Sequence, residues 1–446
     1  MAAQSSGQQQ ARGGWRFLLR ALGHRNYRLF FAGQSVSLIG TWLTRVATAW
    51  LVYRLSGSAM MLGLIGFCGQ IPSFLIAPFA GVLVDRWNRH RVLVVTQVLA
   101  MLQSFALAGL ALTGHITVWH VAWLSMVQGL INAFDIPARQ AFVVEMVEDR
   151  ADLPNAIALN ASMFNGARLL GPSVAGGLIA WVGEGGCFLI DGFSYLAVIA
   201  SLLAMRLTVR PREQRRQHVL TELREGFDYA FRFPPIRAVL GLLALVSLMG
   251  MPFTVLMPVM ASEVLHGGPN TLGFLMAGSG LGALGGAVFL ASRRTVRGFG
   301  SVIAHTTVVF GAGLVAFAVS RNVVLSLVTL ALCGFGMMVT MAACNTLLQT
   351  IVEERMRGRL MSFYSMAFMG TAPFGSLLAG ALAARIGAPA TIAIGGVACL
   401  MGAAWVRVKL PALREQVRPI YRRLGILPEV ASGMQSAAQR VGSAES

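Results

Sequence analysis

Charged side chains are scarce in this sequence of 446 residues. Asp, Glu, Lys and Arg together make up 12% of the chain, whereas apolar residues make up 56%. Soluble domains carry about 25% charged residues, which help to cover the surface that faces water. The shortage therefore excludes a soluble globular protein. Acidic residues are rarer than basic ones, 18 against 36, so the formal net charge is +18.

Several chemical motifs are also missing. The five cysteines, at positions 68, 187, 333, 344 and 399, form no CxxC pair and have no histidine at metal-ligand spacing. We therefore expect apolar core residues and no metal site. No phosphate-binding P-loop occurs, which excludes direct use of ATP. No Ser/His/Asp or HExxH arrangement occurs either, so we expect neither enzyme activity nor a cofactor.

Long apolar runs, by contrast, recur along the whole chain. A helix needs about 20 apolar residues to cross a hydrocarbon layer of roughly 30 Å. Strand-type alternation is absent, and a backbone in lipid must satisfy its own hydrogen bonds, so the runs are predicted to be helices. The fold class is an all-α polytopic membrane protein. Its twelve predicted transmembrane helices are 28–53, 60–84, 91–113, 116–135, 155–182, 187–206, 236–261, 271–291, 300–320, 322–348, 359–385 and 389–408.

The basic residues are distributed unevenly between the two sides of this arrangement. With these helices, 31 of the 36 basic residues fall in the two tails and in the connections on the same side. Three lie on the opposite side, and Arg45 and Arg168 lie inside helices. Positive charge collects in the cytoplasm, so we expect both termini to be cytoplasmic. Such loops attract anionic lipids and form no nucleic-acid patch.

The chain divides into two halves of six helices each. We predict a disordered tail over 1–25, halves over 26–206 and 236–408, and a basic tail over 409–446. The longest polar connection, 207–235, separates the halves. Leu220, Leu223, Phe227 and Phe231 recur there at helical spacing, which indicates an amphipathic helix on the membrane surface; a flexible linker is the alternative.

The two halves are related in sequence. A constant shift of 204 residues superimposes five glycines of the first half on glycines of the second, as well as Gly81 on Gly285 and Arg89 on Arg293. Repeated halves with a site between them are the architecture of many secondary transporters. The five glycine pairs are Gly166 and Gly370, Gly171 and Gly375, Gly176 and Gly380, Gly183 and Gly387, and Gly192 and Gly396.

One charged stretch, "GVLVDRWNRHRV" at 81–92, lies between the second and third predicted helices. With Gly81, Asp85, Arg86 and Arg89 it resembles the loop 2–3 signature of the major facilitator superfamily. A longer segment, "NAFDIPARQAFVVEMVEDRADLPNAIALNASMFNGARLLGPSVAGGLIA" at 132–180, resembles the enterobactin-exporter-like branch, also called transmembrane secretion effectors. The resemblance covers roughly residues 25–410 and implies the major facilitator fold, with two pseudo-repeated six-helix halves.

We interpret this stretch as a conformational latch made of Gly81, Asp85, Arg86 and Arg89 together with Asp135. Asp85 can face the partial positive charge at the start of the helix near Arg359, in the other half. The arginines can pair with Asp135, at the predicted cytoplasmic end of the fourth helix. The alternative is that these arginines serve only to orient the chain in the membrane.

Polar residues inside the predicted helices are candidates for the cavity or for coupling, because ionisable groups in a membrane are costly. Arg45 shares a stripe with Gln34 and Thr41; it could hold an anionic group of the substrate, hold a proton-releasing carboxylate, or form a structural ion pair. Arg168 and Asn165 share a face and could brace a kinked helix instead. Asp191 could titrate during coupling or be solvated at the rim. The full set is Gln34, Thr41, Arg45, Gln128, Asn132, Asn165, Arg168 and Asp191.

The resemblance implies a secondary active transporter of the bacterial inner membrane that works by alternating access. It would export a small amphipathic molecule, such as a siderophore or a drug-like compound, with the proton gradient as driving force and as a functional monomer. Two alternatives remain open within transport, an uptake transporter and a lysophospholipid flippase. A further alternative is a membrane sensor that keeps the fold of a transporter but does not transport.

Overall fold

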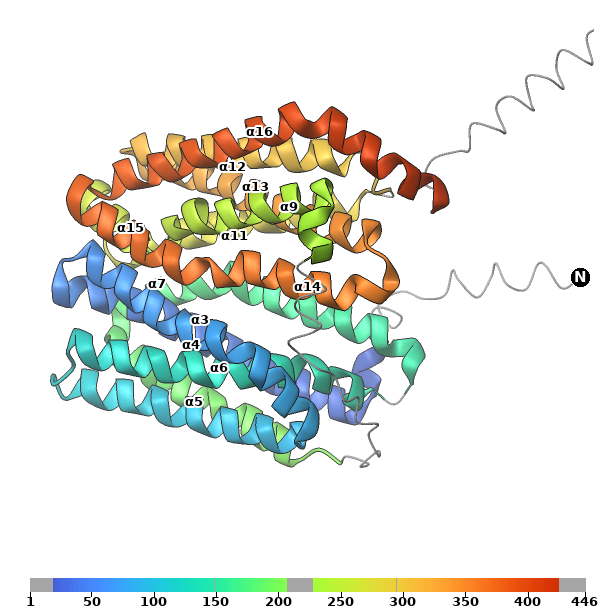
Figure 1. Ribbon diagram of the computed structural model, residues 1–446. Helices are drawn as coiled ribbons and strands as arrows, with labels where there is room; N and C mark the ends of the chain where they lie inside the picture. Colours follow the sequence, from blue (N-terminus) through green and yellow to red (C-terminus); the bar gives the residue numbers. More distant parts are fainter. Residues whose placement is uncertain (1–18, 148, 207–227, 294, 425–446) are drawn as a thin grey trace, which may run out of the picture.

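The computed structural model describes residues 19–147, 149–206, 228–293 and 295–424. All of the regular structure in this part of the chain is helical. The helices lie roughly parallel in two groups, α3 to α7 below and α9 to α16 above (Figure 1). We call the end of the bundle that carries Arg25 and Arg423 the terminal end, and the end that carries Ser56 the distal end.

The first group contains five long helices that follow a short 3-10 turn. The longest, α7, has a residue with non-helical backbone, Gly183, so it consists of two helices joined at a kink. The elements are η2 (Arg20–Gly23), α3 (Arg25–Ser56), α4 (Ala59–Arg86), α5 (Arg89–Leu112), α6 (Val118–Met146), η3 (Arg150–Asp152) and α7 (Leu153–Leu203).

The second group contains more interruptions. Pro252 and Pro258 cannot donate backbone hydrogen bonds, and between Val246 and Val264 the helix changes to π and 3-10 geometry. The elements are α9 (Pro234–Leu245), η4 (Val246–Gly250), η5 (Met251–Thr254), α10 (Met257–Val259), η6 (Met260–Val264), α11 (Pro269–Ala291), α12 (Phe299–Val319), α13 (Val323–Ile351), η7 (Glu354–Met356), α14 (Arg357–Ser365), η8 (Met366–Gly370), α15 (Ala372–Ile386) and α16 (Ala388–Arg423).

The predicted class, a helical membrane protein, is confirmed. Ten helical segments among the described residues are long and apolar enough to cross a membrane. The kinked α7 counts once among these ten, and α6 is not one of them. The number of twelve crossings therefore stays a prediction.

The internal repeat is visible in the backbone. Gly183 and Gly387, which the shift of 204 residues superimposes, both have positive φ, at 73° and 82°. Residues with a side chain rarely adopt such angles. Each glycine lets the chain reverse at the distal end, before the last long helix of its half. The same local geometry thus recurs at equivalent places in both halves.

Two predicted boundaries are wrong. The fourth helix does not end at 135 but continues to Met146, because Pro137 is accommodated inside α6. The last helix does not end at 408 but continues to Arg423, where Val417 is buried and Arg414 donates a hydrogen bond to the Ser301 hydroxyl at 2.8 Å. The predicted amphipathic helix in 207–235 lies mostly outside the described residues.

Candidate functional site

A large cavity lies between the two groups of helices. Its volume is about 1740 Å³, and residues of both halves line it. A space of this size is more than enough for a small organic molecule, because ligand pockets typically have about 300–1,000 Å³. Its position is that of the substrate site in transporters with repeated halves.

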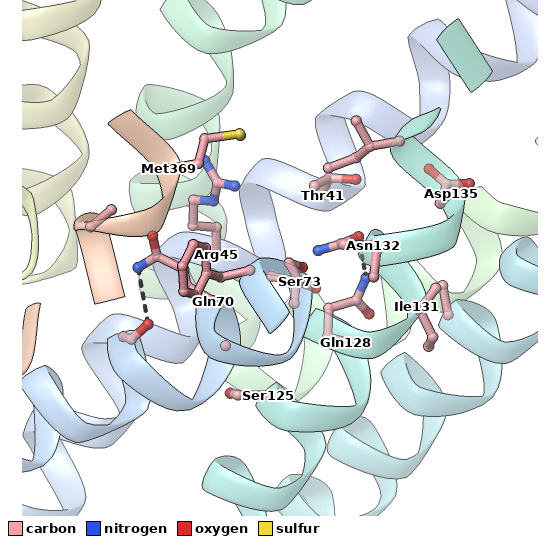
Figure 2. Close-up of a pocket in the computed structure, with 18 of the residues that line it drawn as sticks. Thr41, Arg45, Gln70, Ser73, Ser125, Gln128, Ile131, Asn132, Asp135 and Met369 are labelled. Atoms are coloured by element: carbon pink, nitrogen blue, oxygen red, sulfur yellow. Dashed lines mark hydrogen bonds between the residues drawn. The ribbon is translucent and has the colours of Figure 1, made fainter. Parts of the chain in front are cut away.

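The wall formed by the first half is polar. Gln34, Thr41 and Arg45 of α3 line the cavity, as the predicted stripe requires. Gln128 and Asn132 of α6 also line it and are joined by a hydrogen bond of 3.1 Å. Figure 2 shows Thr41 and Arg45 of α3 and Gln128 and Asn132 of α6 around one space. Gln70 and Ser73 of α4 lie beside them.

The wall formed by the second half is mainly apolar at the middle of the bundle. Four methionines line it, together with Val255, Pro258 and Phe368, and Met366 and Met369 are 44% and 57% exposed. Such exposure on an apolar helix means that these thioethers face the cavity and not a packed core. Flexible methionines adapt to ligands of different shapes. The methionines are Met251, Met276, Met366 and Met369.

Two arginines of the first half line the cavity without a carboxylate. The guanidinium of Arg45 lies over the ring of Trp42, 4.9 Å from its centroid. Arg168 of α7 lines the same cavity, so the two like charges repel each other. Within the described part of the chain, neither guanidinium has a hydrogen-bond or ion-pair partner. The structure therefore does not contain the ion pair that was one interpretation of Arg45.

Asp191 is buried and not solvated at a rim, since only 1% of it is exposed. Its Oδ2 accepts hydrogen bonds from the hydroxyls of Thr44 at 2.7 Å and Ser104 at 2.6 Å. Ser194 donates to its backbone carbonyl at 2.7 Å. The carboxyl group thus connects α3, α5 and α7 at the edge of the cavity, held by hydroxyls and by no cation among the described residues.

Asp135 is also buried, and its partners are not those that the latch requires. It pairs with Arg139 one turn further along α6 and accepts hydrogen bonds from Thr96 at 3.0 Å and Gln97 at 2.8 Å. The prediction placed it at a helix end, but α6 continues for three more turns. The expected pairing of Asp135 with the arginines of the loop is therefore absent.

The loop between α4 and α5 makes its contacts within the first half. Arg89 pairs with Asp85 at 2.8 Å and with Glu145 at 3.1 Å. Glu145 of α6 thus takes the place that the prediction gave to Asp135. The Asp85 side chain is 70% exposed, and among the described residues its ion-pair partner is Arg89. Gly81, Arg86 and the rest of this loop do not line the cavity.

The distal end of the cavity is closed by two helix crossings between the halves. A Cβ on Gly63 of α4 would lie 2.8 Å from the Cα of Gly380 of α15, and a Cβ on Gly176 of α7 would lie 3.1 Å from the Cα of Gly273 of α11. The Cβ on Gly176 would also lie 2.7 Å from the Pro269 carbonyl oxygen, so neither position accepts a side chain without a shift of the backbone, and glycine permits the helices to touch. Gly176 and Gly380 are related by the repeat, so the two crossings are equivalent.

A polar contact between the halves adds to this closure. The Tyr53 hydroxyl of α3 donates to Oε1 of Glu263 in η6 at 2.7 Å, across the two halves at the distal end. At the terminal end, Gln140 of α6 and Arg355 and Arg359 near α14 line the cavity instead. The cavity therefore reaches the terminal end and is shut at the distal end.

The cavity brings together most, but not all, of the predicted residues. Gln34, Thr41, Arg45, Gln128, Asn132, Arg168, Asp191 and Asp135 line it. Asn165 does not; its amide donates to the Ala161 carbonyl at 2.9 Å. The sequence reasoning missed Gln70, Ser73, Arg139 and Tyr195. Arg139 follows Asp135 by four residues, a spacing typical of helical ion pairs, and could have been found from it.

The described residues contain no group of three His, Cys, Asp or Glu side chains that could hold a metal ion. All five cysteines are free thiols, and four of them are buried. What the cavity offers to a ligand is therefore hydrogen bonds, positive charge and apolar surface.

Comparison with known proteins gives one family and several relatives. The model of a family described as "Transmembrane secretion effector" matches residues 19–432. The chain is 24% identical to the "Staphyloferrin A transporter" of Staphylococcus aureus, and 28% identical to the "Multidrug efflux pump Tap" of Mycolicibacterium fortuitum. Each match covers 84% of this chain and 93% of the relative.

A solved structure shares the fold. It is a bacterial homologue of the human lysosomal transporter Spinster, in an inward-facing and unoccupied conformation. The TM-score is 0.60 at 14% identity, and the match covers 90% of this chain and 98% of the other.

Proposed function

The chain belongs to the transmembrane secretion effector family of major facilitator transporters, and on that premise we propose that it is a secondary active transporter that exports a small amphipathic molecule. Relatives along most of its length carry the names of a staphyloferrin A transporter and a multidrug efflux pump. A siderophore or a drug-like compound is the substrate that we expect. Family and relatives are transporters, so we propose no catalytic activity.

The cavity is the observation that carries the proposal. It is lined by both halves, closed at the distal end and open towards the terminal end. Rocking the two six-helix halves, 26–206 and 236–408, would part the glycine crossings and close the terminal end. A substrate bound in the middle would then leave on the distal side, which is alternating access.

The orientation follows from the distribution of basic residues. We place the protein in the bacterial inner membrane with both termini cytoplasmic, since most arginines lie at the terminal end. The described state is then inward-open. Anionic lipids would surround the cytoplasmic loops, and we expect the monomer to be the working unit, because each chain contains a complete cavity.

Protons are the coupling ion that we propose, and Asp191 is the candidate carrier. A carboxyl group held by hydroxyls without a cation can lose its proton only at a cost, so a small change in its surroundings shifts its protonation. Thr44 and Ser104 lie on two different helices, α3 and α5. If these helices move relative to α7 during rocking, the hydrogen bonds that stabilise the Asp191 carboxylate would change.

The latch is proposed in a revised form, made of Asp85, Arg89 and Glu145. In the inward-open state these charges are paired inside the first half. When the terminal end closes, Asp85 would become available to the start of α14 in the second half. The latch would then hold the outward-open state shut towards the cytoplasm.

A flux assay tests the proposal. Purified protein is reconstituted in liposomes that contain a pH-sensitive dye, a proton gradient is imposed, and siderophores, lipophilic drugs and lysophospholipids are added in turn. We expect proton movement with one of the first two classes, and its loss in Asp191→Asn but not in Glu415→Gln, an exposed acid outside the cavity. Asp191→Asn should still exchange labelled substrate without a gradient.

The other outcomes identify the alternatives. Flux of lysophospholipids without proton movement would indicate a flippase, and flux only in the opposite direction would indicate uptake. No flux of any compound, in a folded protein that binds ligands, would favour a sensor that does not transport. Proton movement that persists in Asp191→Asn would refute the role of Asp191.

A further inference from the structure

Arg45 and Arg168 are unusual in their setting. A charged side chain in the middle of a membrane helix costs about 2.5–3.5 kcal/mol or more on insertion scales. Such arginines normally pair with a carboxylate of a neighbouring helix. Here they face the same cavity, repel each other, and have no ion-pair partner among the described residues. Neither one locks two helices together, so their cost is not offset by a structural ion pair.

The other charges of the cavity do not balance these two. Asp135 is bound by Arg139 on its own helix, and Asp191 is held by hydroxyls. Among the described residues the lining has one further acid, Glu354, which is at the terminal end and lies 3.8 Å from Arg357. Five arginines and three acids line the cavity in all. The lining therefore carries more positive than negative charge, and in the described part of the chain Arg45 and Arg168 are its arginines without an ion-pair partner at the middle of the bundle.

The two walls differ in a second respect. At the middle of the bundle, Arg45 and Arg168 lie on the first half, whereas four methionines lie on the second; the lining arginines of the second half, Arg355 and Arg359, are at the terminal end. Figure 2 shows Met369 of the second half on the side of the space where Arg45 lies. A molecule that filled the cavity would touch an arginine-bearing wall with one side and an apolar wall with the other.

We infer that the cavity binds an amphipathic organic anion, with its carboxylate or other anionic group on Arg45 and Arg168 and its apolar part on the methionine wall of the second half. The inference rests on the proposed function and specifies its substrate class. Arginine binds carboxylates through two parallel hydrogen bonds, and here an anion also relieves the repulsion between the two guanidinium groups. Because the ligand touches both halves, its binding would couple their movement.

Equilibrium binding to the intact protein tests this inference without any gradient. The protein is placed in lipid nanodiscs, and three radiolabelled probes of the same size are used: 4-hexylbenzoate, its neutral amide 4-hexylbenzamide, and the cation 4-hexylbenzylamine. Equilibrium dialysis gives the affinities, with empty nanodiscs to subtract partition into lipid. We expect the wild type to bind the benzoate at least tenfold more tightly than the benzamide, and the benzylamine most weakly.

Variants then locate the charge preference. Arg45→Gln and Arg168→Gln should each weaken benzoate binding at least tenfold and leave benzamide binding within twofold, which also reports that the cavity is still folded. Arg297→Gln, an exposed arginine outside the cavity, is the matched control and should change neither affinity. Arg45→Lys should recover part of the benzoate affinity, because it restores charge without the two parallel hydrogen bonds.

Equal affinities of the wild type for benzoate and benzamide would overturn the inference, whether or not the variants fold. So would a loss of benzoate affinity in Arg45→Gln no larger than in Arg297→Gln. Binding without charge preference in a protein that still couples flux to protons would refute the anion site alone. Charge-selective binding without any flux would refute the proposed transport and leave the anion site intact.

Discussion

The substitution Gly176→Ala should open the distal end of the cavity. A Cβ at this position would lie 2.7 Å from the Pro269 carbonyl oxygen and 3.1 Å from the Cα of Gly273, both backbone atoms of α11. Neither can move aside unless α7 and α11 separate. Overpacking of this kind costs about 1–3 kcal/mol, and it applies only while the helices touch.

This overpacking cost changes the populations of the inward-open and outward-open states. The outward-open state, in which α7 and α11 have separated, does not contain the clash. A cost of about 1–3 kcal/mol in one state alone shifts the equilibrium roughly 5- to 150-fold towards the other. Alanine also stabilises the helix itself relative to glycine, but it does so in both states, so this gain cancels.

The assay measures the opening directly. Spin labels are attached at Leu112 at the distal end of α5 and Val319 at the distal end of α12, which lie on opposite sides of the bundle (Figure 1). The five native cysteines are first replaced by alanine. Double electron–electron resonance then gives the distribution of distances, and Gly176→Ala should move it towards longer distances.

Gly177→Ala is the control. A Cβ on Gly177, the next residue of the same helix, would meet no atom within 4 Å. It carries the same change in helix propensity without the clash, so its distance distribution should match that of the wild type. If Gly176→Ala also matched the wild type, or if both variants shifted equally, the glycine crossing would not hold the distal end closed.

Three further predictions concern single groups. Tyr53→Phe removes the hydrogen bond to Glu263, and such bonds contribute about 0.5–1.5 kcal/mol. It should shift the spin-label distances in the same direction as Gly176→Ala, with the ratio of outward-open to inward-open protein changed by only a few-fold. An unchanged distribution would exclude this bond from the closure. Gly183→Ala forces a side chain into a backbone conformation with φ 73° and ψ 175°, which costs about 1–3 kcal/mol, so the midpoint of thermal unfolding should fall. Gly177→Ala should leave the midpoint unchanged, and equal midpoints of the two variants would contradict the strain. Asp85→Asn should abolish flux in liposomes, with Asp228→Asn as control. Thermal stability should be unchanged, because the exposed ion pair of Asp85 with Arg89 contributes under about 1 kcal/mol. Normal flux in Asp85→Asn would refute the latch.

The fold class could be predicted from the sequence because it depends on long-range averages. Apolar runs of membrane length and glycines repeated at a constant shift survive errors of several residues in any one helix. The stripe of Gln34, Thr41 and Arg45 could be predicted for a similar reason, since helical spacing alone brings these side chains to one face. Asn165 shows the limit of that argument, because it shares a face with Arg168 but bonds to its own helix.

Boundaries and partners could not be predicted in the same way. The fourth predicted helix ends at 135, where its apolar run ends, two residues before Pro137. In the structure it continues, and as a result Asp135 is buried beside Arg139 while Glu145 is the carboxylate near Arg89. Pairings of this kind depend on how far one helix slides along another, which no local pattern contains.

The glycine crossings that close the distal end could not be predicted from the sequence either. Gly63 contacts Gly380, and Gly273 contacts Gly176. Gly176 and Gly380 are related by the shift of 204 residues, but Gly63 and Gly273 are not. The shift singles out Gly176 and Gly380, but among the 50 glycines of the chain the sequence does not distinguish the two that they contact. Their role follows only from the distance between two backbones.

Access to the cavity from each side of the membrane is the most direct test of the account. A single cysteine replaces Gln128, which lines the cavity, in a protein without native cysteines, and a membrane-impermeant maleimide is applied to one side at a time. We predict rapid labelling from the cytoplasmic side alone, and labelling from the outside once Gly176→Ala is added, at the expense of the cytoplasmic rate. Simultaneous rapid labelling from both sides would indicate an open channel and would contradict alternating access.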